Sequence, residues 1–174
     1  LGDVMEDSGV LPIRQAHAVA ASLLDILADI HGKGIAHNDI KPDNILFDSQ
    51  WNPRIIDFGI SWDFAGDRGD ARGGVLVGSA GYIAPELLRG GAPSARSDLY
   101  SFGVVFAQML CGRPVQSYEE VAAGRLVPRP YLGFFARCLA DDPAARFDSA
   151  RAAAEALAGI SAVQERAITL DIEG

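Results

Sequence analysis

The sequence contains little lysine, little cysteine and no long apolar run. Of its 174 residues only Lys33 and Lys41 are lysine, and the formal net charge is −8. This balance argues against a general nucleic-acid-binding protein, which needs basic patches that displace counterions. It equally disfavours binding to the anionic cytoplasmic face of a membrane. Because no apolar run reaches the length of a transmembrane helix, we expect no membrane segment in this chain.

Cysteine occurs only at Cys111 and Cys138, which is too few for a disulfide framework or a cysteine-based zinc site. We therefore expect two buried thiols in a reducing compartment and a cytoplasmic protein. The chain begins with Leu1 and not with methionine, as a fragment or a processed product would. Its acidic first ten residues lack the positive start and apolar block of a signal peptide. Frequent Ala, Gly and Arg together with rare Lys indicate a GC-rich bacterial source.

The spacing of apolar residues predicts a mainly helical fold. Residues 13–31 carry apolar side chains at helical intervals, and residues 96–110 are apolar on nearly every side, which is typical of a buried central helix. Two strand-like runs, residues 45–47 and 54–56, flank a turn-forming segment and predict a β-hairpin. Residues 60–82 show no period and are expected to form a long irregular loop. Shorter helices are predicted at residues 84–89, 119–123, 131–139 and 149–157, the last capped by Asp148 or Ser149 and stopped by Gly159.

The residues suited to catalysis are concentrated in the segment 37–44, His-Asn-Asp-Ile-Lys-Pro-Asp-Asn. Asp39 could orient and deprotonate an attacking hydroxyl group, and Lys41 could place an ammonium group beside a transferred phosphoryl group. Asn44 offers an amide oxygen to a metal ion, and Asp57 follows it thirteen residues later. Because a hairpin brings its two ends together, we expect Asn44 and Asp57 to lie side by side as magnesium ligands.

Five segments together resemble the motifs of protein kinases. The segment 37–44 resembles their catalytic loop, and Asp57-Phe-Gly resembles their magnesium motif. Residues 78–86, Gly-Ser-Ala-Gly-Tyr-Ile-Ala-Pro-Glu, are similar to the segment that ends in Ala-Pro-Glu. Residues 97–103 are similar to the start of the buried central helix, and residues 142–146 to a late loop with a structural arginine. These motifs occur in the order and spacing of the family, and that combination is far more specific than any one of them.

The resemblance implies a fold, a reaction and a set of roles. The fold is the large, C-terminal lobe of a serine/threonine protein kinase over residues 1–159, a mainly α-helical bundle with a small β-hairpin next to the catalytic loop, followed by a tail at residues 160–174. The reaction transfers the γ-phosphate of ATP, with Mg²⁺, to a Ser or Thr hydroxyl group of a protein substrate. By resemblance, Asp39 is the base, Lys41 contacts phosphate, Asn44 and Asp57 bind the metal, Ser79 links the substrate-binding loop to the catalytic loop, Asp98 holds the catalytic-loop backbone, and Glu86 pairs with Arg146.

The three histidines are expected to have no catalytic role. His37 is interpreted as a packed, hydrogen-bonded core residue. His17 and His31 are interpreted as surface or helix-end residues.

The sequence departs from the family pattern in two places. Asn38 stands where many protein kinases have an arginine that binds a phosphate group on the activation loop, and residues 63–76 contain no Ser, Thr or Tyr. We therefore expect an enzyme that does not depend on phosphorylation of this loop. The residues before His37 contain no glycine-rich loop, and Lys33 is too close to His37 to be the strand lysine that binds the α- and β-phosphates. The small N-terminal lobe is thus expected to be a missing partner, and this chain alone is expected to be inactive.

Two other functions stay open at this stage. A catalytically dead, kinase-like binding module would explain the missing lobe, but it leaves the joint presence of Asp39, Lys41, Asn44 and Asp57 unexplained. A small-molecule phosphotransferase of the aminoglycoside-kinase type shares the general layout. The Ala-Pro-Glu segment, residues 84–86, favours the protein kinase, because in that family it shapes a peptide-binding shelf.

Overall fold

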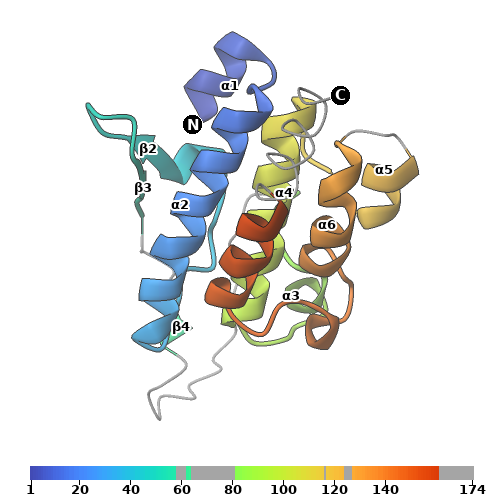
Figure 1. Cartoon of the computed structure of the whole chain (residues 1–174). Coiled ribbons are helices and arrows are strands. Elements are labelled where there is room, and N and C mark those ends of the chain that lie inside the picture. Colours follow the sequence, from blue (N-terminus) through green and yellow to red (C-terminus); the bar gives the residue numbers. More distant parts are fainter. Residues whose placement is uncertain (58–61, 64–80, 116, 124–126, 161–174) are drawn as a thin grey trace.

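The fold is built around two long helices that pack side by side, α2 (Ile13–Gly32) and α4 (Ala95–Cys111). In the computed structural model (Figure 1), α2 stands between a small β-hairpin and α4, and α6 (Leu132–Cys138) and α5 (Tyr118–Ala123) lie on the far side of α4. The structure describes residues 1–57, 62–63, 81–115, 117–123 and 127–160. Helices dominate this part of the chain, so the predicted helical lobe is confirmed.

Helix α2 follows directly from its apolar pattern. It begins after Pro12, whose fixed φ suits the entry to a helix. One face is buried, and the residues on that face recur every three or four positions: Ala16, Ala20, Leu23, Leu24, Leu27 and Ile30. The helix ends before Gly34, which has a φ of 74°. The helix predicted over residues 13–31 is confirmed.

Helix α4 is the centre of the core. Ser94 caps its start and forms a reciprocal capping box with Ser97, and Gly112, with a φ of 80°, ends it. Twelve of its 17 residues are buried, as predicted for a central helix. Phe102 and Phe106 form the α4 part of an aromatic cluster that extends into α6.

Strands β2 (Ile45–Phe47) and β3 (Pro53–Ile55) form the predicted hairpin. The carboxylate of Asp48 builds the turn, because it accepts hydrogen bonds from the backbone N–H groups of Gln50 and Asn52 at 2.9 and 3.0 Å. The hydrogen bond with Asn52, followed by the others in the turn, lowers the pKa of Asp48. The second strand begins one residue earlier than predicted, since its first residue is paired with Phe47 across the turn.

Several short elements were not predicted from the sequence. They are helix α1 (Gly2–Ser8) and the strand pair β1 (Ile35–Ala36) with β4 (Trp62–Asp63). A strand pair of two residues each is too short to show an alternating apolar pattern. Short 3-10 turns lie at η1 (Pro42–Asn44), η2 (Arg129–Tyr131) and η3 (Pro143–Ala145).

The later helices match their predictions except at one end. Helix α3 (Pro85–Leu88), α5 and α6 lie inside or next to the predicted ranges. The last helix, residues 150–160, is capped by Ser149, whose Oγ accepts a hydrogen bond from the backbone N–H of Ala152 at 3.1 Å. The prediction that Gly159 stops this helix is wrong. Glycine ends a helix by adopting a left-handed φ, and Gly159 is not among the residues with positive φ.

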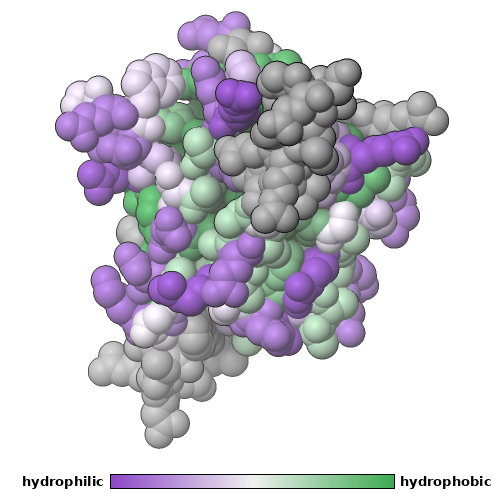
Figure 2. All heavy atoms as spheres, in the orientation of Figure 1, coloured by the Kyte–Doolittle hydropathy of each residue, from purple (hydrophilic) through white to green (hydrophobic). Residues whose placement is uncertain are grey.

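On the face seen in Figure 2, hydrophilic and hydrophobic side chains are interspersed. None of the helices in the described ranges combines the length and the apolar character that a bilayer span requires.

The contact between α4 and α6 depends on the absence of a side chain at Gly103. A Cβ atom built there would lie 2.7 Å from Cβ of Cys138, an atom that no rotamer change can move. We predict that Gly103→Ala lowers the free energy of unfolding by about 1–3 kcal/mol, because the two helices must separate. Gly133→Ala in α6 is the matched control, since nothing lies within 4 Å of its Cβ position. It should raise the free energy of unfolding by about 0.5–1 kcal/mol. Equal effects of the two substitutions in urea denaturation would contradict this account of the contact.

Candidate active site

The residues predicted as base, phosphate contact and metal ligand meet in one short loop. The turn η1 folds the chain back, so that Asn44 reaches Asp39 and donates through Nδ2 to its Oδ2 at 2.8 Å and to its backbone oxygen at 2.9 Å. The ammonium group of Lys41 lies 2.9 Å from the same Oδ2. Asp39 and Asn44 are buried, and Lys41 is partly exposed. The structure therefore brings these three residues together around a single carboxylate.

Asp57 lies at the other end of the hairpin. The backbone N–H of Ile56 donates to the backbone oxygen of Asn44 at 2.9 Å, so the two ends of the hairpin meet there. Asp57 is the next residue, with an exposed side chain and a φ of 64°. A left-handed φ is uncommon outside glycine, and aspartate is among the residues that tolerate it best. The chain thus places Asp57 one residue beyond the backbone hydrogen bond that Asn44 accepts.

The backbone before Asp39 is held by the carboxylate of Asp98. This side chain is 1% exposed and accepts hydrogen bonds from the N–H groups of His37 at 2.7 Å and Asn38 at 2.8 Å. Asn38 adopts a φ of 68°. Asp98 lies in the first turn of α4, where the partial positive charge of the helix N-terminus favours a carboxylate.

The three histidines occupy different positions. His37 is fully buried, and its Nε2 lies 3.0 Å from the backbone oxygen of Ile56. His31, predicted to be a surface or helix-end residue, does lie in the last turn of α2, but it is not on the surface: its side chain is 8% exposed and its Nε2 lies 2.8 Å from Oδ2 of Asp98. His17 is half-buried beside η2, with Nδ1 2.9 Å from the hydroxyl group of Tyr131, and burial lowers the pKa of His17. The contact of His31 spans 67 positions in the sequence, and no local pattern could indicate it.

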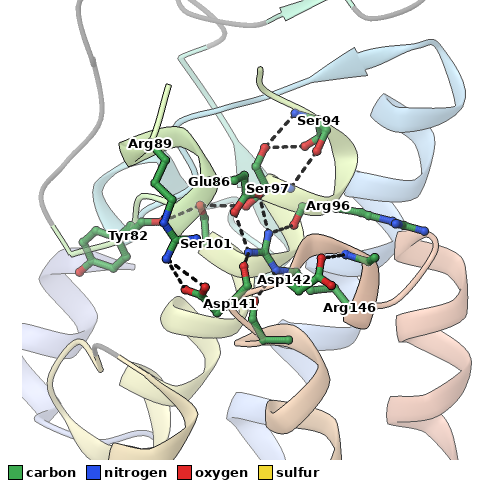
Figure 3. A network of polar contacts seen from close by, with 12 residues as sticks. Tyr82, Glu86, Arg89, Ser94, Arg96, Ser97, Ser101, Asp141, Asp142 and Arg146 are labelled. Carbon is green, nitrogen blue, oxygen red and sulfur yellow. Dashed lines mark hydrogen bonds and ion pairs between the residues drawn. The ribbon is translucent and has the colours of Figure 1, made fainter. Parts of the chain in front are cut away.

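The partly exposed carboxylate of Glu86 fixes helix α3 through the buried side chain of Arg146. Arg146 donates through Nη1 and Nη2 to the two carboxylate oxygens of Glu86, each at 2.7 Å (Figure 3). The same guanidinium group also donates to the backbone oxygens of Arg96 and Ala140, at 2.9 Å each, and its side chain is 0% exposed. In this bidentate geometry two parallel N–H···O hydrogen bonds join the planar guanidinium group to the planar carboxylate. Helix α3 is thereby joined to the start of α4 and to the loop after α6.

The segment before α3 is attached to α4 at two points that the sequence did not reveal. Ser101 Oγ donates to the backbone oxygen of Tyr82 at 2.7 Å, and the hydroxyl group of Tyr82 donates to Oε1 of Gln108 at 2.6 Å. Burial raises the pKa of Tyr82, and the hydrogen bond to Gln108 opposes this effect. Ser101 and Gln108 lie two turns apart on α4, so both ends of Tyr82 are fixed by one helix.

Part of the predicted site lies outside the described residues. Ser79 and most of the irregular loop, residues 58–61 and 64–80, are in this group. Within the described ranges, no cluster of three or more His, Cys, Asp or Glu side chains is placed to hold a metal ion.

Comparison with known proteins decides the family. The model of the protein kinase domain matches residues 1–156. The chain belongs to the protein kinase family. Serine/threonine-protein kinase PDK1 of Cryptococcus neoformans is 37% identical to this kinase chain over 118 residues, which cover 66% of the chain and 10% of that protein. Probable serine/threonine-protein kinase PknB of Bifidobacterium longum is 40% identical over 126 residues, 71% of the chain and 18% of that protein.

The relatives of this kinase chain come from different kingdoms and are much longer than the part that aligns. Serine/threonine-protein kinase PknB of Mycobacterium leprae is 35% identical over 114 residues, which cover 66% of the chain and 18% of that protein. The aligned segment therefore spans less than a fifth of each of the three relatives. Both fungal and bacterial kinases are among them, so the relatives alone do not establish a bacterial source.

The Glu86–Arg146 pair gives a stability prediction. Glu86→Ala leaves the buried guanidinium group of Arg146 without its counter-charge, and we expect the free energy of unfolding to fall by about 3–5 kcal/mol. Asp141→Ala is the matched control, because Asp141 pairs with Arg89 through both carboxylate oxygens but the two side chains are 68% and 63% exposed. Its loss should cost no more than about 0.5 kcal/mol. Thermal and urea unfolding of both variants test the difference, and a control as destabilising as Glu86→Ala would show that burial is not the cause.

Proposed function

We propose that this chain is the large lobe of a protein serine/threonine kinase, which transfers the γ-phosphate of ATP to a Ser or Thr hydroxyl group of a protein substrate. The observation that carries the proposal is the carboxylate of Asp39, which is buried and bonded to Asn44 and Lys41 in a loop fixed by Asp98. The names of the relatives, several of them serine/threonine-protein kinases, support the same reaction.

Asp39 is the proposed base. Its contacts with Asn44 and Lys41 are both made by Oδ2, so Oδ1 is the oxygen that we assign to the hydroxyl group of the substrate. A base acts within hydrogen-bond reach of the proton that it removes, and these contacts hold the carboxylate in one orientation. Lys41 is the proposed contact to the transferred phosphoryl group, since its ammonium group lies beside the base and is partly exposed.

Asn44 and Asp57 are the proposed ligands of Mg²⁺. The amide nitrogen of Asn44 is engaged by Asp39, so its oxygen Oδ1 is the atom that suits a cation. The exposed carboxylate of Asp57 follows the point where the hairpin ends meet. One amide and one carboxylate are a sufficient protein contribution, because Mg²⁺ keeps waters and substrate phosphates as its other ligands. When bound, Mg²⁺ would neutralise charge on the phosphates.

The hairpin offers an apolar surface next to this site. Leu46 and Ile56 are 49% and 38% exposed. Leu46 lies two residues beyond Asn44 on β2, and Ile56 is paired with Asn44 across the hairpin, so all three side chains belong to one face. We propose that the adenine ring of ATP and the small N-terminal lobe cover this face, and that the small lobe is encoded upstream of Leu1.

The remaining assignments follow the family pattern. We propose that residues 1–159 form the lobe and residues 160–174 a tail, and the family match ends close to this boundary, at residue 156. We propose that Ser79 connects the substrate-binding loop to Asp39. Both cysteines are free thiols, which suits the bacterial cytoplasm that we propose as the location.

The base assignment gives a first activity prediction. In the protein with its upstream sequence, Asp39→Asn should lower kcat by about 10²–10⁴-fold and leave the affinity for ATP nearly unchanged, because only proton removal is lost. Asp25→Asn, at an exposed position on α2, is the control and should behave as the parent protein. Phosphorylation of a peptide library and ATP titration measure both quantities. If Asp39→Asn retains full activity, Asp39 is not the base.

The missing lobe gives a second activity prediction. The purified 174-residue chain should transfer no measurable phosphate to peptide substrates, because half a cleft neither encloses ATP nor excludes water. The same chain with its upstream sequence should be active. Labelling by the 174-residue chain alone would contradict the proposal. A complete protein that binds ATP but transfers no phosphate would favour the kinase-like binding module.

A further inference from the structure

The imidazole of His31 has one polar partner in the described part of the chain. Its Nε2 lies 2.8 Å from Oδ2 of Asp98. Its Nδ1 is buried and has no hydrogen-bond partner among the described residues. A carboxylate can only accept, so Nε2 must carry the proton and act as the donor. Within the described ranges, the only hydrogen bond of this side chain is therefore the one that Nε2 donates to Asp98.

Asp98 needs this donor because its charge is almost completely removed from water. Oδ2 accepts from both His31 Nε2 and the backbone N–H of His37, whereas Oδ1 accepts from the backbone N–H of Asn38. Across the described ranges, His31 is the only basic side chain that pairs with Asp98. A buried carboxylate that loses a donor must turn towards another donor or remain under-compensated, and either response loosens its remaining hydrogen bonds.

Those remaining hydrogen bonds hold the backbone immediately before Asp39. Asn38 has a φ of 68°, and its side-chain oxygen is buried without a partner in the described ranges. Its backbone hydrogen bond to Asp98 is therefore the contact that stabilises this uncommon conformation. A change in the φ of Asn38 rotates the next peptide unit and displaces the carboxylate of Asp39.

We propose that His31 is a positioning residue for the base, which acts through Asp98 and the backbone of His37 and Asn38. The proposal rests on the proposed kinase function for its effect on rate, but the coupling itself is a property of the hydrogen-bond network. It connects the last turn of α2 to the catalytic loop, which no local sequence pattern indicates.

The experiment compares His31→Leu, which removes the donor, with His31→Gln, whose amide nitrogen can replace Nε2. His17 supplies the matched control, because it lies on the same helix, about 21 Å away, and has a hydrogen bond of 2.9 Å to buried Tyr131. In the protein with its upstream sequence, His31→Leu should lower kcat about 10-fold, with the KM for ATP within about twofold of the parent value. His31→Gln should recover most of kcat. His17→Leu should lower the melting temperature without lowering kcat.

Amide hydrogen exchange measures the coupling without reference to activity. His31→Leu should accelerate exchange at the N–H groups of His37 and Asn38 by about 10-fold, because one hydrogen bond of net stabilisation is lost. His31→Gln should restore slow exchange, and His17→Leu should leave both amides unchanged. Unchanged exchange in His31→Leu would overturn the proposal. So would equal losses of kcat in the two leucine variants, since stability alone would then explain the effect.

The two proposals fail in distinguishable ways. If the complete parent protein transfers no phosphate, the kinase function fails, but the exchange rates still decide whether His31 holds the loop. If Asp39→Asn abolishes activity and His31→Leu changes neither kcat nor exchange, the kinase function stands and the role of His31 is refuted.

Discussion

The buried carboxylate of Asp98 is the constraint on which the site depends. It joins three parts of the chain, the start of α4, the end of α2 and the loop that carries Asp39. An ionised group at 1% exposure is costly unless donors surround it. All three donors lie 60 or more positions before Asp98 in the sequence. The carboxylate is therefore compensated only when α2, α4 and the loop have reached their final positions. The cost of burial thus enforces a single geometry of the loop.

Helix α4 holds two parts of the chain, the loop that carries Asp39 and the segment before α3. Its first turn holds the catalytic loop through Asp98, and its middle holds the segment before α3 through Ser101 and Gln108. Arg146 adds a third connection, because it binds Glu86 and the backbone of Arg96 together. The close approach of α6 at Gly103 keeps α4 packed against the aromatic side chains of α6. The groups proposed for chemistry therefore lie in loops and short turns, and the carboxylate that holds their backbone lies on a long helix.

The sequence predicted the features that repeat along the chain or follow a compact motif. The apolar spacing of residues 13–31 and 96–110 located α2 and α4, and the turn around Asp48 located the hairpin. Short elements such as β1, with only two residues, have no period that could be detected. The contact of His31 with Asp98 could not be predicted either, because the two residues are 67 positions apart and meet only through the packing of α2 against α4. The roles proposed for Asp39, Lys41, Asn44 and Asp57 came from residue chemistry and spacing together with motif resemblance, and the structure adds that the first three are in direct contact.

The bidentate pair between Glu86 and Arg146 also has a consequence for the order in which the chain acquires structure. The two residues are 60 positions apart, and the ribosome releases Glu86 well before Arg146. Helix α3 has only four residues and no side-chain cap, and so short a helix is not stable by itself in water. During synthesis α3 therefore stays unformed until the segment around Arg146 emerges. A nascent chain interrupted before that segment would carry the loop around Asp39 without a formed helix α3.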